Sequence, residues 1–114
     1  MAQKYSSSPI EEISALYAIT QPEEVTDFVE NNPFLIPLVS STYQNIRKYF
    51  SSYSKVTLDV ETDVEDGTKS LAAHMVTSLP LEEAHKQLKQ FDWHWWLNVL
   101  KQARSKFYVD MELE

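Results

Sequence analysis

The feature that most constrains how this chain folds is the segment at residues 91–96, Phe-Asp-Trp-His-Trp-Trp. It places all three tryptophans of the chain beside a phenylalanine, and each aromatic ring can bury about 150–250 Å². We expect this segment to anchor the core. If it is helical, Trp93 and Trp96 lie on one face while Trp95 projects elsewhere, so the three indoles cannot all enter one core. The sequence predicts two buried indoles and one available for contact, and we expect Trp93 to be the least buried.

Asp92 is a suitable N-cap, because its side chain can accept a hydrogen bond from the first turn of a helix. The sequence therefore predicts a break at this residue and a new short helix from Trp93, with Phe91 packed against its first turns. Before the break, a helix begins near Leu81 with proline and two acids in its first turn, where the helix dipole favours them. Its apolar stripe consists of Leu81, Ala84, Leu88 and Phe91.

The chain before residue 50 has helical signals. Ser8-Pro9-Ile10-Glu11 and Thr20-Gln21-Pro22-Glu23 each have the form of a capping box with a proline in the first turn. The first predicts a helix with an apolar stripe, and the second predicts a short helix that ends at Asn31-Asn32-Pro33.

A third helix is predicted from Pro33 to about Phe50, where the helical period of apolar residues is the best in the chain. Pro37 lacks an amide hydrogen and crowds the preceding turn. Either the helix kinks there, or its regular part begins nearer Ile36. The predicted buried face consists of Leu35, Val39, Tyr43, Ile46 and Phe50.

From residue 55 the apolar residues alternate with polar ones, which is typical of strands with one wet face. The pattern predicts strands at about 56–61, 70–77 and 107–113. Asp66-Gly67 holds the single glycine of the chain, at a hairpin turn that needs positive φ. In the second strand Leu71, Ala73 and Met75 are expected to face the core.

The fold class expected from this order is α+β: N-terminal helices followed by β-β-α-β. A right-handed crossover through the helix makes the strand at 107–113 parallel to the strand at 70–77. We expect a three-stranded, antiparallel sheet packed against helices, in the order 2-1-3 with the strand at 56–61 in the middle.

Residues 1–114 are expected to form a single domain, because this length supports one sizeable core. The polar residues 1–7 are expected to fray, with a helical part at 8–50 and a β-β-α-β part at 55–114. A hydrophobic fraction of 43% is ample for collapse and excludes a wholly disordered chain.

The formal net charge of −7 argues against binding to duplex nucleic acid, which needs a basic face. The first 46 residues hold six acids and Lys4 as the single base. Such an acidic surface keeps a small domain soluble and can attract a basic partner.

The absence of cysteine excludes disulfides, a thiolate nucleophile and a cysteine-ligated metal. One glycine excludes a glycine-rich phosphate loop. No apolar run reaches the roughly 18 residues of a membrane span, and the first residues lack the apolar centre of a signal peptide. We therefore expect a cytoplasmic protein that does not bind membranes and needs no cofactor.

The titratable residues give no catalytic or metal signature. The histidines at 74, 85 and 94 contain no pair at helical spacing, so the sequence predicts no metal site. The acids between Glu61 and Asp66 do not follow the calcium-loop pattern and predict a solvated turn. No glycine-flanked serine elbow is present. These observations favour a protein that is not an enzyme.

Five segments of the chain carry a resemblance to known proteins: Asn31–Leu35, Ile46–Phe50, Asp59–Asp63, Thr77–Ala84 and Phe91–Leu97. They resemble segments of a group of small acidic α+β proteins of bacteria, many of them cyanobacterial, that share a Phe-Asp-x-x-Trp-Trp-Leu segment. The resemblance covers roughly residues 31–114, and it implies an intracellular bacterial protein that works through contacts. No established activity or functional residue comes with it.

Two hypotheses for function remain. The first is a non-catalytic protein-interaction or regulatory module, for example antitoxin-like, that contacts another protein or a second copy of itself. The alternative is a small hydrolase or small-molecule-binding protein, with His74 or His94 and nearby carboxylates in a pocket between sheet and helices. The candidate partner-binding residues are Trp93, Trp95, His94 and Tyr108.

Overall fold

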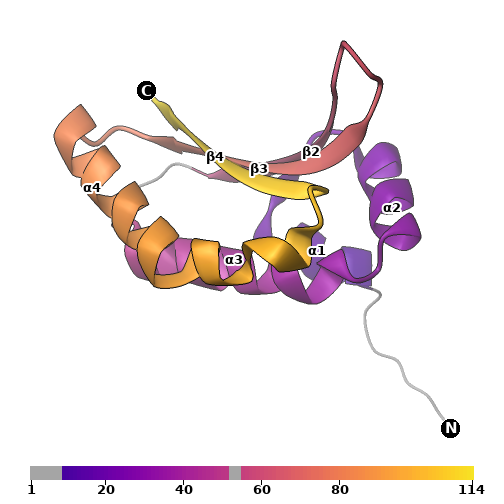
Figure 1. Cartoon of the computed structure of the whole chain (residues 1–114), viewed down its shortest axis with the longest axis horizontal. Coiled ribbons are helices and arrows are strands. Elements are labelled where there is room, and N and C mark those ends of the chain that lie inside the picture. Colours follow the sequence, from indigo (N-terminus) through magenta and orange to yellow (C-terminus); the bar gives the residue numbers. More distant parts are fainter. Residues whose placement is uncertain (1–8, 52–54) are drawn as a thin grey trace, which may run out of the picture.

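The computed structural model describes residues 9–51 and 55–114. The predictions for residues 1–7 and for Ser8 as a helix cap lie outside this part of the chain. Within it, helices pack against one face of a four-stranded sheet (Figure 1). The helices are α1 (Pro9–Leu16), α2 (Pro22–Asn31), α3 (Leu35–Tyr49) and α4 (Leu81–Phe91). The strands are β1 (Ala18–Ile19), β2 (Val56–Thr62), β3 (Lys69–Thr77) and β4 (Phe107–Leu113).

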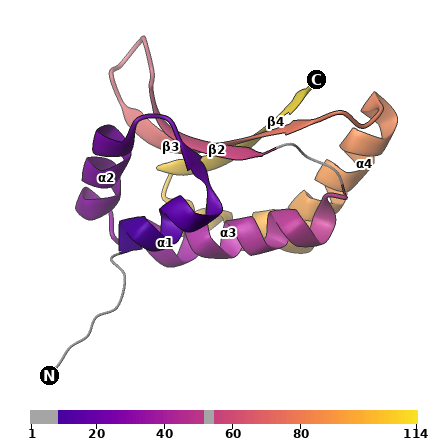
Figure 2. The ribbon, with the colours of Figure 1, turned by 180° about the vertical axis from the view of Figure 1, so that it is seen from behind.

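The helices lie to one side of the sheet when the molecule is seen from the front and from behind (Figures 1 and 2). α3 runs beneath the strands, and α4 packs beside it. α2 stands next to β2 at one end of the sheet. No helix that the structure describes covers the opposite face of the sheet, which we call the open face.

The α+β class is confirmed, but the predicted three-stranded antiparallel sheet in the order 2-1-3 is wrong. The order is β1-β2-β3-β4, with β2 and β3 antiparallel and both outer pairs parallel. β4 is parallel to β3, as predicted, but lies directly beside it. The reason is β1, which pairs with β2 and occupies the edge that β4 was expected to take. The other edge of the β2–β3 pair, along β3, remains free, and β4 pairs there.

The register of the strands separates two kinds of side chain. Val60, Leu71 and Phe107 lie side by side and are buried against the helices. The next residue on each strand points its side chain to the open face, because side chains alternate along a strand. The predicted core facing of Leu71, Ala73 and Met75 is confirmed, and Gly67 has the positive φ, 75°, that the hairpin turn requires.

The helical signals before residue 50 are mostly confirmed. The regular part of α3 begins at Leu35, so Pro37 sits in the first turn, where a missing amide costs no helical hydrogen bond. Thr20 is not the cap of α2. The N-cap is Gln21, without a side-chain capping bond, because the preceding residues extend to pair as β1.

The predicted helix break at Asp92 is wrong. α4 continues into a π-helical turn, η1 (Asp92–Trp96), then into α5 (Leu97–Val99) and a 3₁₀ turn, η2 (Leu100–Ala103). A π-turn is wider than an α-turn, so Trp95 and Trp96 both flank Phe91, with ring centroids 5.5 and 6.4 Å away. Trp93 points away from the core, and the prediction that it shares a face with Trp96 is also wrong.

Candidate functional site

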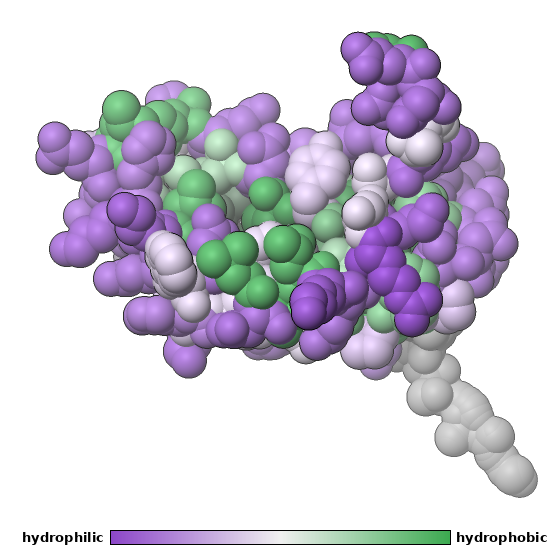
Figure 3. Space-filling view, in the orientation of Figure 1, coloured by the Kyte–Doolittle hydropathy of each residue, from purple (hydrophilic) through white to green (hydrophobic). Residues whose placement is uncertain are grey.

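The exposed side of the helical segment α4–η1–α5 carries the largest exposed aromatic side chain that the structure describes. Trp93 is 66% exposed, which confirms that it is the least buried indole, and Leu97 on the next turn is 49% exposed. Hydrophobic residues gather over this segment, in the lower middle of the view, with hydrophilic residues around them (Figure 3). Leu81, predicted to be in the buried stripe, is also exposed.

A hollow of about 410 Å³ lies on this surface between the indole of Trp93 and the neighbouring turns. We call this surface the Trp93 face. It lies on the side of the helix turned away from Phe91, which is fully buried. A hollow beside an exposed indole is the kind of place where a partner inserts an anchoring side chain. The residues of the Trp93 face are His85, Leu88, Lys89, Asp92, Trp93 and Leu97.

Most of the segment that carries the Trp93 face has a charge opposite to that of the whole chain. Residues 84–106 contain one acid, Asp92, and five bases, although the chain has 17 acids and 10 bases. Partial burial raises the pKa of the Asp92 carboxyl above its usual value. The bases are Lys86, Lys89, Lys101, Arg104 and Lys106, and all are exposed.

The other candidate residues do not join Trp93 in one surface. Trp96 is buried against Phe91 and Phe107. Trp95 is half-buried and lines a separate hollow of about 260 Å³ with residues of α3, including Pro37 and Leu38. His94 is exposed, with its ring edge-on to Tyr49 at 5.9 Å. These placements leave Trp93 as the central aromatic residue of the helix surface.

Tyr108, the fourth predicted candidate, lies on β4 at the open face of the sheet. Its ring meets that of His74 edge to face, with centroids 6.3 Å apart. His74 lies on β3 between Ala73 and Met75, which are buried against the helices. Because side chains alternate along a strand, His74 faces away from the helices. The alternative hypothesis placed a catalytic histidine in a pocket between sheet and helices, and His74 lies on the other side of the sheet.

His74 is surrounded by carboxylates from both neighbouring strands. Its Nε2 atom is 3.3 Å from Asp59 Oδ1 and 3.5 Å from Glu61 Oε2, both on β2. Its Nδ1 atom is 3.3 Å from Asp110 Oδ2 on β4. The side chains of His74 and Asp59 are only 20% exposed. We call Asp59, Glu61, His74 and Asp110 the histidine–carboxylate cluster.

The electrostatics of this cluster favour positive charge at its centre. Partial burial lowers the pKa of His74, but the negative charge of Asp59 and hydrogen bonds to Glu61 and Asp110 outweigh it and raise the pKa. The pKa of Tyr108 is raised by burial and by the same carboxylates. A cation is therefore stabilised here, and an additional anion is not.

Sequence reasoning missed Asp59, Glu61 and Asp110 as members of one cluster. The alternating pattern already placed each of them on the polar side of its strand. The register brings them together. Asp59 pairs with Ala72, which is two residues from His74 on the same face of β3, and His74 pairs with Asp110 on β4. The alternating pattern does not give the strand order on which this register depends.

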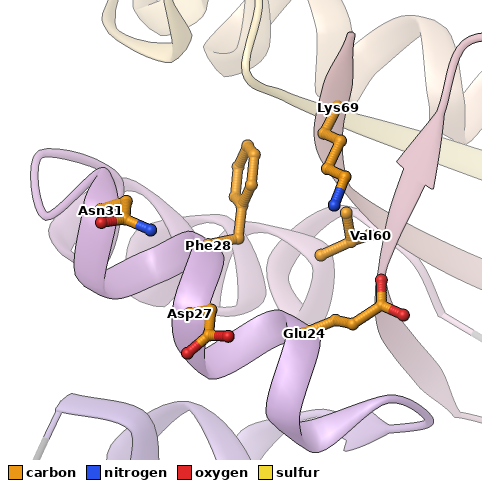
Figure 4. A pocket seen from close by; sticks show the side chains of 6 residues that line it. All are labelled: Glu24, Asp27, Phe28, Asn31, Val60 and Lys69. Atoms are coloured by element: carbon orange, nitrogen blue, oxygen red, sulfur yellow. The ribbon is translucent and has the colours of Figure 1, made fainter. Parts of the chain in front are cut away.

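A smaller hollow of about 150 Å³ lies between α2 and the base of the β2–β3 hairpin. Lys69 extends from β3 past Val60 toward α2, which carries Glu24 and Asp27 (Figure 4). Pockets for small molecules usually enclose about 300–1,000 Å³. The size of this hollow therefore gives no support to the small-molecule alternative.

In the described part of the chain, no helix combines the length and the apolar character needed to cross a bilayer. No protein-family model, curated protein or solved structure matches the chain. The resemblance to small cyanobacterial proteins stays a prediction.

Proposed function

We propose that this protein is a non-catalytic interaction module that binds another protein through the Trp93 face. The observation that carries the proposal is the contrast between the three indoles. Trp96 and Trp95 pack against Phe91, whereas Trp93 leaves about two thirds of its surface in water. An exposed indole beside exposed leucines leaves apolar surface in water, and that surface contributes no burial free energy to folding. Tryptophan is also the residue most enriched among binding hot spots.

The charge of the surface indicates the kind of partner. Lys89 lines the Trp93 face and Lys86 lies about one turn before it on α4, which favours a partner with an acidic rim around an apolar anchor. A symmetric dimer through this face would place the same basic residues of two copies against each other. We therefore favour a different, acidic protein over a second copy of this chain.

A membrane surface is a weaker alternative for the same face. Basic helices with tryptophan and leucine can lie on anionic bilayers. Here, however, Glu82 and Glu83 lie beside Leu81 in the first turn of α4, and Asp92 lies within the face itself. These acids would be repelled by anionic headgroups. A protein surface can provide separate partners for acids and bases.

A regulatory role follows if the partner is an enzyme whose surface is covered by the module. Antitoxins act in this way, so an antitoxin-like role is one form of the proposed function. The module itself would then need no catalytic residue.

The test is capture of the tagged protein and its variants from a lysate of the source organism, with identification by mass spectrometry. A stoichiometric partner is expected with the wild type and is expected to be lost with Trp93→Ala. Val64→Ala is the control, because Val64 is an apolar side chain that is 99% exposed but lies in the hairpin loop. The control is expected to retain the partner.

The purified partner then allows a quantitative measurement by calorimetry. Trp93→Ala is expected to weaken binding at least about 30-fold, as for a hot-spot residue. Lys89→Glu is expected to weaken it as well, and Glu82→Lys should not. Equal retention of the partner by Trp93→Ala and wild type would overturn the proposal. Binding of the wild type to anionic vesicles that Trp93→Ala abolishes, without a protein partner, would favour the membrane alternative instead.

A further inference from the structure

The histidine–carboxylate cluster lies where three neighbouring strands meet on the open face. β2 contributes Asp59 and Glu61, β3 contributes His74 and β4 contributes Asp110. The Trp93 face is on a helix on the other side of the sheet, so the two sites are separate. The cluster combines an imidazole with carboxylates, which are the ligand types that first-row transition metals accept in proteins.

The two separations from the His74 ring to the neighbouring carboxylates match those between ligands of a tetrahedral metal site. A zinc ion sits about 2.0–2.2 Å from nitrogen and oxygen ligands. Two ligand atoms on a tetrahedron of that size are about 3.4 Å apart. The separations from His74 Nε2 are 3.3 Å to Asp59 Oδ1 and 3.5 Å to Glu61 Oε2. Donor atoms of all three residues lie within 4.8 Å of one another.

Asp59 supplies an independent observation. Its Oδ1 atom is buried and accepts no hydrogen bond, although it lies 3.3 Å from the His74 ring. A buried carboxylate oxygen without a partner is destabilising. One proton on His74 Nε2 cannot point at both Asp59 and Glu61. A metal ion can be bound by both carboxylates and the imidazole at once.

Asp110 is placed to orient the histidine. Its Oδ2 atom is 3.3 Å from His74 Nδ1, so the ring can donate its Nδ1 proton to this carboxylate. The Nε2 lone pair then points toward Asp59 and Glu61. Metal-binding histidines usually donate their other ring proton to a carboxylate or carbonyl in this manner.

The acidic hairpin loop lacks these features. Asp63 Oδ1 accepts hydrogen bonds from the amides of Glu65 and Asp66. Asp66 Oδ1 accepts from the amide and the hydroxyl of Thr68. These oxygens are satisfied by the turn itself, so the loop serves as a control for non-specific binding by acids.

We propose that Asp59, Glu61 and His74 bind a divalent first-row transition-metal ion on the open face, with Zn²⁺ as the best fit. Asp110 is a positioning residue for His74. Imidazole ligation disfavours Mg²⁺ and Ca²⁺, which take oxygen ligands. Three protein ligands leave one tetrahedral position open toward solvent. The ion would link β2 to β3 and, through Asp110, to β4.

The test uses the full chain without a histidine tag, after treatment with EDTA and its removal. Isothermal titration with ZnCl₂ is expected to give one saturable site, and MgCl₂ is expected to give none. At a free Zn²⁺ concentration of about 100 times Kd, the Tm is expected to rise by roughly 10 °C. MnCl₂ is expected to broaden the amide NMR signals of Asp59, Glu61 and His74 before those of the hairpin loop.

Variants separate the site from surface acids. Asp59→Asn keeps the shape of the side chain and is expected to weaken Zn²⁺ binding at least about 100-fold, as is His74→Gln. Asp110→Asn is expected to weaken it about 10- to 100-fold and to keep one site, as for a residue that acts through a ligand. Glu65→Gln in the hairpin and Glu112→Gln on β4 are expected to bind as the wild type does.

Absence of saturable Zn²⁺ binding to the wild type would overturn the proposal. So would binding that survives in Asp59→Asn, or Mn²⁺ broadening centred on the hairpin loop. If a variant fails to fold by circular dichroism, the NMR result on the wild type decides. Metal binding is measured here without any partner protein, so it stands or fails independently of the proposed function.

Discussion

The rings of Phe91 and Trp96 stack with centroids 6.4 Å apart and planes inclined by 14°. They are five positions apart in the chain, a spacing that an α-helix does not place on one side. The π-turn makes the contact possible and turns Trp93 outward. The two adjacent indoles Trp95 and Trp96 also contact each other, at 5.9 Å. One local widening of the helix therefore both completes the core and creates the Trp93 face.

Trp96→Ala is expected to destabilise the protein by ~3–5 kcal/mol, as truncation of core tryptophans does. Trp93→Ala is expected to change the free energy of unfolding by less than about 1 kcal/mol, because its indole is largely in water. Urea unfolding of both variants measures the difference. Equal losses of stability would contradict the division between core and contact indoles.

Tyr17→Phe is expected to cost about 1 kcal/mol. The Tyr17 hydroxyl is buried and donates a hydrogen bond of 2.8 Å to the carbonyl of Val39 in α3, which holds the end of α1 against the third helix. Chemical denaturation monitored by circular dichroism measures the loss. Tyr17→Leu should lose more, because it also removes the ring that packs against Tyr43 at 5.3 Å. Unchanged stability of Tyr17→Phe would show that water replaces the bond at no cost.

Asp92→Asn is expected to raise stability at neutral pH. Burial raises the pKa of Asp92, so the folded protein favours the protonated form and ionisation destabilises it. No penalty exists below the ordinary Asp pKa of about 4. It grows as pH rises from there and is complete above the folded pKa. Thermal unfolding should therefore show a higher Tm for Asp92→Asn at pH 7 and equal Tm values near pH 3.

Asp66 provides the control of opposite sign. Hydrogen bonds from the backbone and side chain of Thr68 lower the pKa of Asp66. Its contribution to stability is present above the ordinary Asp pKa and is lost as pH falls through the folded pKa. Asp66→Asn should thus lower the Tm at pH 7. A shift of the same sign in both variants would contradict the assignments.

Ser105→Gly is expected to stabilise the protein by about 0.5–1 kcal/mol. Arg104 and Ser105 both have positive φ, 50° and 61°, a conformation that costs residues other than glycine about 1–2 kcal/mol. Part of the gain is lost to the greater entropy of the unfolded glycine. Arg104→Gly should gain less, because the Arg104 guanidinium stacks over Phe34 at 4.3 Å. Urea melts of the two variants give the comparison.

The sequence predicts most of the helices and strands because their apolar periods are long. α3 shows its stripe over four turns, and the alternation in β2 and β4 identifies which residues face the core. The strand order was wrong because β1 has two residues, too few to show a period. The π-turn was missed because Asp92 resembles a cap and because helical spacing assumes α-turns.

The two candidate sites differ in how much of each can be predicted from the sequence. The limit on how many adjacent indoles can enter one core predicts that one of the three stays exposed, but the π-turn decides that it is Trp93. The histidine–carboxylate cluster depends on the register across β2, β3 and β4. That register follows from pairing between residues as distant as 74 and 110, which no local pattern contains.

The parallel pairing of both outer strands has a consequence for the order in which the protein folds. β2 and β3 are joined by a hairpin, a pairing that closes in microseconds. β1 meets β2 through residues 18 and 57, and β3 meets β4 through residues 71 and 107, so each outer pairing must first close a long loop. Such distant contacts slow the search for the native state. The hairpin is expected to form early and the outer strands to join it last, so the carboxylate of Asp110 reaches His74 only when folding is nearly complete.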